Sequence, residues 1–87
     1  MEIRIEPHTL ERANERGASK EEILQTIKSG LPIEAKAGRK AKALIVEFRQ
    51  KRNDKYYEQK KIEVYYIEEN NTIITVTVYV LYGKFNN

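Results

Sequence analysis

A histidine and two arginines near the start of the chain recur at intervals of four residues, as His8, Arg12 and Arg16. At ~100° per residue, each would lie only ~40° from the previous one around a helix axis, so a helix would carry them as one stripe. Guanidinium groups bind phosphate through paired hydrogen bonds, and an imidazole exchanges a proton near neutral pH. The stripe could therefore cleave RNA without a metal: the 2′-hydroxyl is the nucleophile, His8 is the acid or base, and the two arginines stabilise the phosphate.

The same stripe also has a structural interpretation. The carboxylates of Glu15, or of Glu22 in the helix expected next, could pair with Arg12 and Arg16 and fasten the two helices together. His8 would then only help to cap the first turn of its helix. The spacing of these residues does not decide between the two interpretations.

Basic and aromatic residues in the second half of the chain are further candidates for RNA contacts. The chain has six tyrosines and two phenylalanines, and bases could stack on those that are exposed, although tyrosine is also a common strand residue. A cluster of lysines and arginines could bind phosphates or could be an ordinary solvated surface. The residues assigned to nucleic-acid binding are Lys51, Arg52, Lys60 and Lys61.

Composition restricts the class of protein. The 87 residues, of which 40% are hydrophobic, suffice for a single domain (1–87) with one modest core. The chain has no Cys, one His and one Asp, so we expect no disulfide and no transition-metal site, and any chemistry should be metal-free or at most Mg-dependent through Glu. A chain this short also leaves little room for a cofactor, and we expect none. Its formal net charge of +3 permits an anionic partner without requiring one. The first residues lack the apolar core of a signal peptide, and no apolar run approaches the ~18 residues of a membrane helix, so we expect a cytoplasmic protein without membrane association.

Two helices are expected in the first third of the chain. Pro7 suits the first turn of a helix and Gly17 a position just after its end, which predicts a helix over residues 7–16. Ser19 and Glu22 have the spacing of a capping box, in which each side chain binds an unpaired backbone N–H, and they predict a second helix to about Ser29. The short connection between the two predicts a helix hairpin.

The remainder of the chain alternates with a period near two and is rich in β-branched and aromatic residues, which predicts antiparallel strands. We expect strands near 33–37, 43–50, 60–68 and 72–82, a turn at 38–42, a looser exposed loop over 51–57 and a tight turn at Asn70–Asn71. The expected fold is therefore α+β, with an N-terminal helix hairpin packed on one face of a four-stranded antiparallel sheet.

The last expected strand should present different residues on its two faces. Alternation places Ile74, Val76, Val78 and Val80 under the helices, and Thr75, Thr77 and Tyr79 on the opposite face. A half-polar second face could be the floor of a cleft, although any sheet covered on one side shows the same pattern.

Several of these features together resemble a known family. They are the run Pro7-His8-x-x-x-Arg12-x-x-x-Arg16-Gly17, the Ser-x-x-Glu helix start, the glycine after the second helix and the closing Thr77-Val78-Tyr79. This pattern resembles domain of unknown function 4258, a family of small prokaryotic proteins, over nearly the whole chain. That family is similar to the barnase, colicin E-five, colicin D and RelE-like group of small ribonucleases.

The resemblance implies an endoribonuclease or toxin-like ancestry, with the active surface where the first helix meets the sheet. It marks as catalytic candidates His8, Arg12, Arg16, Thr77 and Tyr79. Barnase-like enzymes use a glutamate as general base, and here no glutamate has a place that the motif determines. Glu47 and Glu63, both in the expected sheet, are the plausible substitutes.

Three functions are compatible with these observations. The first is a metal-independent endoribonuclease of the toxin–antitoxin type, which acts on RNA or on the ribosome and is controlled by an antitoxin. The second is a non-catalytic RNA- or protein-binding module with a basic rim. The third is a structural or regulatory subunit whose strand edge pairs with a partner chain. Strand order, and the choice between monomer and homodimer, stay open at this point.

Overall fold

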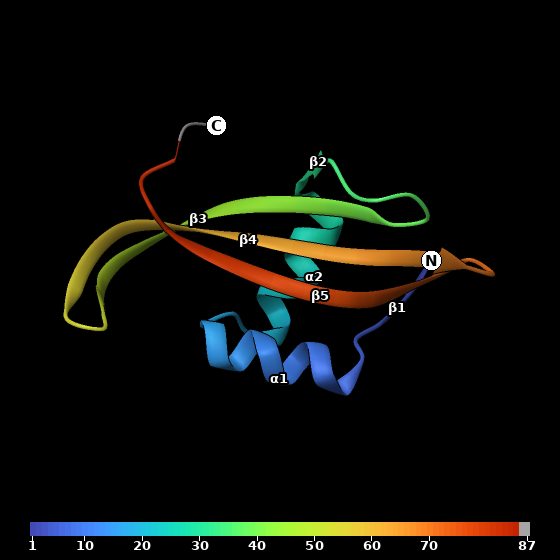
Figure 1. Ribbon diagram of the computed structural model, residues 1–87, viewed down its shortest axis with the longest axis horizontal. Coiled ribbons are helices and arrows are strands. Elements are labelled where there is room, and N and C mark those ends of the chain that lie inside the picture. Colours follow the sequence, from blue (N-terminus) through green and yellow to red (C-terminus); the bar gives the residue numbers. More distant parts are fainter. Residues whose placement is uncertain (86–87) are drawn as a thin grey trace.

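The computed structural model describes residues 1–85, which form two helices and five strands (Figure 1). In chain order the elements are β1 (Glu2–Arg4), α1 (Pro7–Arg16), α2 (Lys20–Ser29), β2 (Leu31–Ile33), β3 (Lys40–Arg52), β4 (Lys55–Glu69) and β5 (Thr72–Gly83). The α+β class is confirmed. Within residues 1–85, no helix is long and apolar enough to cross a membrane.

The strands form a single mixed sheet in the order β1-β5-β4-β3-β2. Three long neighbours, β3, β4 and β5, are antiparallel and form its centre, whereas β1 and β2 are three-residue strands at its two edges. β1 runs parallel to β5, with Ile3 opposite Ile73. The expected four-stranded antiparallel sheet is therefore wrong. Residues 2–6 alternate between charged and apolar side chains, but this run is too short to identify as a strand without its partner, which lies at the other end of the chain.

Both helices cover the same face of the sheet, but they do not form the expected hairpin. α1 packs along β5, whereas α2 runs across the strands behind β3 and β4 (Figure 1). The change of direction occurs at Gly17, which has a φ of 96° and ends α1 with a hydrogen bond from its N–H to Ala13 O. The capping box of Ser19 and Glu22 then begins α2, as predicted.

The turns differ in part from the expectation. Asn70 and Asn71 both have positive φ and form the expected tight turn. The predicted loop over 51–57 is wrong, because β3 and β4 continue to a second tight turn at Asn53 and Asp54, whose φ values are 53° and 65°. The strand predicted at 33–37 lies earlier, at Leu31–Ile33, and has a proline as its middle residue.

The core lies between the sheet and the two helices. It is built around Ala13 of α1, Ile23 and Ile27 of α2, and Ile62 and Val64 of β4. All five are 0–3% exposed. This single core fixes α1 and α2 on one face and leaves the opposite face of the sheet without a helix among the described residues.

A bulge in β5 reverses part of the predicted alternation. Thr75 pairs with Tyr66 and Thr77 with Tyr65, so Val76 has no partner of its own on β4. Val78 and Val80 face the helices as predicted, but before the bulge it is Ile73 and Thr75, rather than Ile74 and Val76, that do so. A bulge of one residue exchanges the two faces of a strand, and the sequence pattern alone does not reveal it.

Candidate functional site

The His/Arg stripe of α1 lies against the outer edge of β5. β1 pairs with β5 only as far as Ile74, so the carbonyls beyond it need other donors. His8 Nε2 lies 3.1 Å from Val76 O, and Arg16 donates a hydrogen bond of 2.6 Å to Val78 O. Two members of the stripe therefore close a sheet edge. In this way the helix protects backbone groups that could otherwise pair with another chain.

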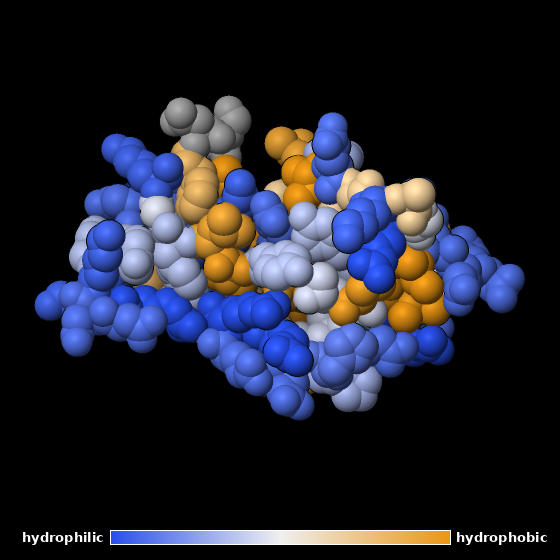
Figure 2. All heavy atoms as spheres, in the orientation of Figure 1, coloured by the Kyte–Doolittle hydropathy of each residue, from blue (hydrophilic) through white to orange (hydrophobic). Residues whose placement is uncertain are grey.

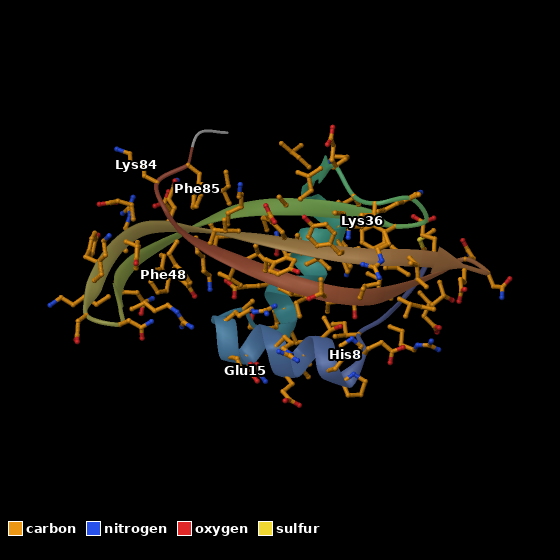
Figure 3. The ribbon with its side chains drawn as sticks, in the orientation of Figure 1. His8, Glu15, Lys36, Phe48, Lys84 and Phe85 are labelled. Carbon is orange, nitrogen blue, oxygen red and sulfur yellow. The ribbon has the colours of Figure 1, made fainter. Side chains whose placement is uncertain are left out.

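Arg12, the middle member of the stripe, is exposed on α1. Among residues 1–85 no hydrogen bond or ion pair to its side chain is found. The expected pairing of Arg12 and Arg16 with Glu15 or Glu22 is not found among the described residues: Arg16 binds Val78 O, and Glu22 binds Lys60 at 3.0 Å. Figure 3 shows His8 and Glu15 at opposite ends of α1.

The C-terminal end of α1 is bound by side chains of the sheet. Arg52 donates a hydrogen bond of 2.9 Å to Glu15 O, and Tyr82 donates one of 2.6 Å to Arg16 O. Lys60, which is only 8% exposed, donates one of 2.8 Å to Gly17 O. Cations are favourable at a helix C-terminus because its free carbonyls carry partial negative charge. Two of the four residues assigned to RNA binding, Arg52 and Lys60, thus contact α1.

The other two lie elsewhere. Lys51 is exposed on the hairpin of β3 and β4, opposite Tyr56. Lys61 lies on the helix-free face, where its ammonium is 3.6 Å from the carboxylate of Glu63 and 5.1 Å from the ring centroid of Phe85. The four residues therefore do not form one surface.

The helix-free face carries a small basic and aromatic depression. In Figure 1, α2 lies behind the strands, and Figure 2 shows the face opposite it, on which apolar and polar residues are interspersed. A hollow of about 230 Å³ on this face is lined by Lys36, Arg39, Tyr65, Thr77 and Tyr79. We call it the tyrosine hollow. Lys36 reaches it from the segment between β2 and β3, and lies over the sheet in Figure 3.

The two aromatic rings of the tyrosine hollow are in contact with one another. The ring centroids of Tyr65 and Tyr79 are 5.7 Å apart in an edge-to-face arrangement. The Arg16 guanidinium lies 5.1 Å from the Tyr79 centroid. Arg16 thus connects the α1 stripe to the hollow, and Thr77 and Tyr79, marked by the family resemblance, lie in the hollow itself. His8 and Arg12 are not among its lining residues.

Glu63 lies beside the tyrosine hollow and is held by its neighbours on β4. It is opposite Tyr79 on β5 and opposite Ala43 on β3. The Tyr65 hydroxyl donates a long hydrogen bond of 3.5 Å to Glu63 Oε1. Burial raises the pKa of Tyr65, and the adjacent Glu63 carboxylate adds to that effect. The phenol therefore stays protonated at neutral pH, next to an acid–base group.

Both edges of the sheet are partly protected against pairing with another strand. α1 covers the β5 edge, and on the other side β2 is short and contains Pro32, which lacks an N–H. β2 covers only residues 41–43 of β3, and further along β3 the register with β4 shifts between Glu47 and Gln50, with Arg49 at a φ of 48°. Such bulges and prolines are common means by which proteins prevent edge-to-edge association.

Sequence reasoning missed Lys36, Arg39 and Tyr65 as members of one site. Arg39 lies in the turn expected at 38–42 and Lys36 just before it, but nothing in the sequence joined these two residues to β4 and β5. Within the described residues, no group of three or more His, Asp or Glu side chains is placed to hold a metal ion. No protein-family model, curated protein or solved structure matches this chain. The resemblance to domain of unknown function 4258 accordingly stays a prediction.

Proposed function

We propose that the protein is a metal-independent endoribonuclease that binds single-stranded RNA on the helix-free face of its sheet. The observation that carries the proposal is the tyrosine hollow, where two cations, two aromatic rings and a hydroxyl surround a depression beside Glu63. This site differs from the stripe that the sequence favoured. The proposal assumes a cytoplasmic protein, since RNA and ribosomes are found there.

Binding would combine charge and stacking. Lys36 and Arg39 are exposed cations, and each phosphate that they neutralise releases condensed counterions. Tyr79 is 46% exposed, so its ring can accept an unstacked base. Base–aromatic stacking contributes about 1–3 kcal/mol per base and tolerates any base, so we expect modest sequence preference at this position.

Cleavage would use Glu63 and Tyr65 as a proton-transfer pair. The 2′-oxygen attacks phosphorus and the bond from phosphorus to the 5′-oxygen breaks, which leaves a 2′,3′-cyclic phosphate and a free 5′-hydroxyl. Glu63 accepts the proton of the 2′-hydroxyl, and the Tyr65 hydroxyl gives a proton to the 5′-oxygen. The hydrogen bond between the two side chains then returns the proton to Tyr65. Lys36 and Arg39 stabilise the charge that develops on the phosphorane.

A non-catalytic RNA-binding module is the second candidate. It is favoured by the fact that His8 and Arg16, the residues first expected to act on the phosphate, are both engaged with carbonyls of β5. Under this candidate the same hollow holds RNA without turnover. A protein partner, such as an antitoxin, would then act by covering the helix-free face.

The first experiment measures the integrity of total RNA in bacterial cells after expression of the wild-type protein or of Glu63→Gln. Fragmented RNA with the wild type and intact RNA with Glu63→Gln, at equal levels of folded protein, is the expected result. Glu63→Gln keeps the shape of the side chain and removes its basicity, so an equal degree of fragmentation would overturn the catalytic assignment. Intact RNA in both strains would favour the binding module.

The second experiment measures binding of a fluorescent single-stranded RNA at several salt concentrations. Lys36→Ala/Arg39→Ala should weaken binding and lower the slope of log affinity against log salt by about 1.4, at ~0.7 per lost phosphate contact. The matched control, Lys20→Ala/Lys28→Ala, removes two exposed cations from α2 and should leave the affinity nearly unchanged. Equal losses in the two double variants would show that only net charge matters and would contradict the assignment of the site.

A further inference from the structure

A second hollow lies on the helix-free face, toward β2. It has a volume of about 410 Å³, and its walls are formed chiefly by Leu31, Ile33, Ala43 and Ile45. Of the described residues that line this hollow, Lys61 carries a charge. We call it the apolar hollow. Leu31 is 69% exposed, and the small side chain of Ala43 opposite it keeps the space open.

The two hollows flank Glu63. Along β4 the face carries Lys61, Glu63 and Tyr65 in succession, so the apolar hollow begins at Lys61 and the tyrosine hollow at Tyr65. Alternate residues of a strand are ~7 Å apart, which places Lys61 and Tyr65 at ~13 Å from one another with Glu63 midway. The Glu63 carboxylate contacts both neighbours, at 3.6 Å to Lys61 Nζ and 3.5 Å to the Tyr65 hydroxyl.

From this arrangement we infer that the apolar hollow is a second nucleobase subsite, which binds the base adjacent to the one in the tyrosine hollow. The inference rests on the proposed function and deepens it. Two splayed bases, one in each hollow, place the phosphodiester that joins them beside Glu63. Single-stranded RNA presents bases in this unstacked way, and each base offers an apolar face to an apolar wall.

The charges around the hollow favour a nucleotide over a protein segment. Lys61 on one side of Glu63, and Lys36 and Arg39 on the other, provide cations along the path of an RNA backbone. At the edge formed by β2, Pro32 lacks an N–H, so a protein strand added there would lose a regular donor. The hollow is therefore better matched by a base and its phosphate than by an added strand.

The test is a double-mutant cycle between protein and RNA. Ala43→Leu fills the apolar hollow from its floor, and Ala37→Leu makes the same change on the exposed segment between β2 and β3, outside this hollow. The probe is a fluorescent tetranucleotide RNA, compared with versions that lack one base at each position in turn. Affinities are measured by fluorescence anisotropy, and circular dichroism checks that both variants are folded.

We expect Ala43→Leu to weaken binding of the intact tetranucleotide about 5- to 150-fold, from ~1–3 kcal/mol per stacked base. The wild type should lose a similar factor when the RNA lacks the base at one particular position, and Ala43→Leu should lose nothing more with that RNA. Ala37→Leu should behave as the wild type.

Three results would overturn the inference. RNA binding that is equal in Ala43→Leu and the wild type would remove the subsite and leave the proposed function standing. If the loss of affinity caused by Ala43→Leu simply added to the loss caused by each missing base, no base would occupy the apolar hollow, and the substitution would affect RNA binding only indirectly. A wild type that binds none of these RNAs would remove the proposed function as well; if Ala43→Leu then changed the oligomeric state, the hollow would be a contact between copies of the chain.

Discussion

Lys60 provides the sharpest test of how the sheet holds α1. Its side chain is only 10% exposed, and its ammonium donates hydrogen bonds of 2.8 Å to Gly17 O and 3.0 Å to Glu22 Oε1. The same Glu22 oxygen accepts a hydrogen bond from Ser19 N as part of the capping box of α2. Lys60 thus joins the end of α1, the start of α2 and the middle of β4. We predict that Lys60→Met destabilises the protein by about 2–3 kcal/mol.

The magnitude follows from the exposure of the two partners. Removing one member of a buried ion pair costs about 3–5 kcal/mol, because the other charge is left without a partner. Glu22 is 28% exposed and keeps its hydrogen bond to Ser19 N, so water and the capping box compensate part of that cost. Methionine also preserves the apolar stem of the lysine. For a domain of this size, a loss of 2–3 kcal/mol corresponds to about 10–20 °C in Tm.

Lys40→Met is the matched control. Lys40 forms an ion pair of similar length with Glu68, at 3.2 Å, but its side chain is 63% exposed and that of Glu68 33% exposed. Surface pairs of this kind contribute less than about 1 kcal/mol. Both variants are unfolded in urea, and unfolding is followed by circular dichroism. The slope of the free energy of unfolding against urea concentration shows whether the two unfolded states are comparable. Equal destabilisation of the two variants, or a loss below about 1 kcal/mol in Lys60→Met, would refute the reasoning.

Three further predictions test other parts of the structure. Gly30→Ala should lower the free energy of unfolding by more than about 2 kcal/mol in thermal denaturation, since an added Cβ would lie 2.8 Å from a backbone carbonyl oxygen of β3. His8→Ala should cost about 1 kcal/mol of stability, for one lost hydrogen bond, and leave RNA cleavage per folded molecule unchanged; loss of cleavage with an intact fold would restore His8 as a catalytic residue. Burial raises the pKa of Tyr65, Tyr66 and Tyr82 above the ordinary value of 10.0, so these tyrosines ionise at lower pH in the unfolded chain than in the folded protein. The free energy of unfolding should therefore be full below about pH 10 and fall as the pH rises above it, which urea midpoints measured at increasing pH would show.

The local parts of the fold were predictable from the sequence. The signals of Pro7, Gly17 and the capping box lie within one turn of the helix ends that they mark, and both helices have the expected bounds. The paired asparagines at 70–71 act in the same local way. β1 could not be predicted from such signals, because its three residues are stabilised by β5, about seventy positions away. The same reason applies to the bulge at Val76, which depends on the register with β4.

The candidate site was less predictable than the fold. The stripe of α1 was correctly identified as a row of side chains on one helix face, but its spacing could not show that backbone acceptors of β5 lie within reach. The structural interpretation was right that the stripe holds α1 in place but wrong about the partners. His8 and Arg16 contact carbonyls of β5, so His8 does not cap α1, and Glu22 binds Lys60. Acceptors on a backbone leave no signature in a sequence, since every residue has one.

Arg16 is the member of the α1 stripe that contacts the tyrosine hollow, through the ring of Tyr79. Its guanidinium donates to Val78 O at the edge of β5 and lies over the ring of Tyr79 on the helix-free face. A lysine could supply the charge, but only a planar guanidinium combines a fixed hydrogen-bond direction with stacking on an aromatic face. The chain therefore uses one residue both to close the sheet edge and to position the most exposed ring of the tyrosine hollow. The stripe on α1 therefore lies next to the tyrosine hollow through Arg16 alone. The groups proposed to act on RNA come instead from β4, β5 and the segment before β3.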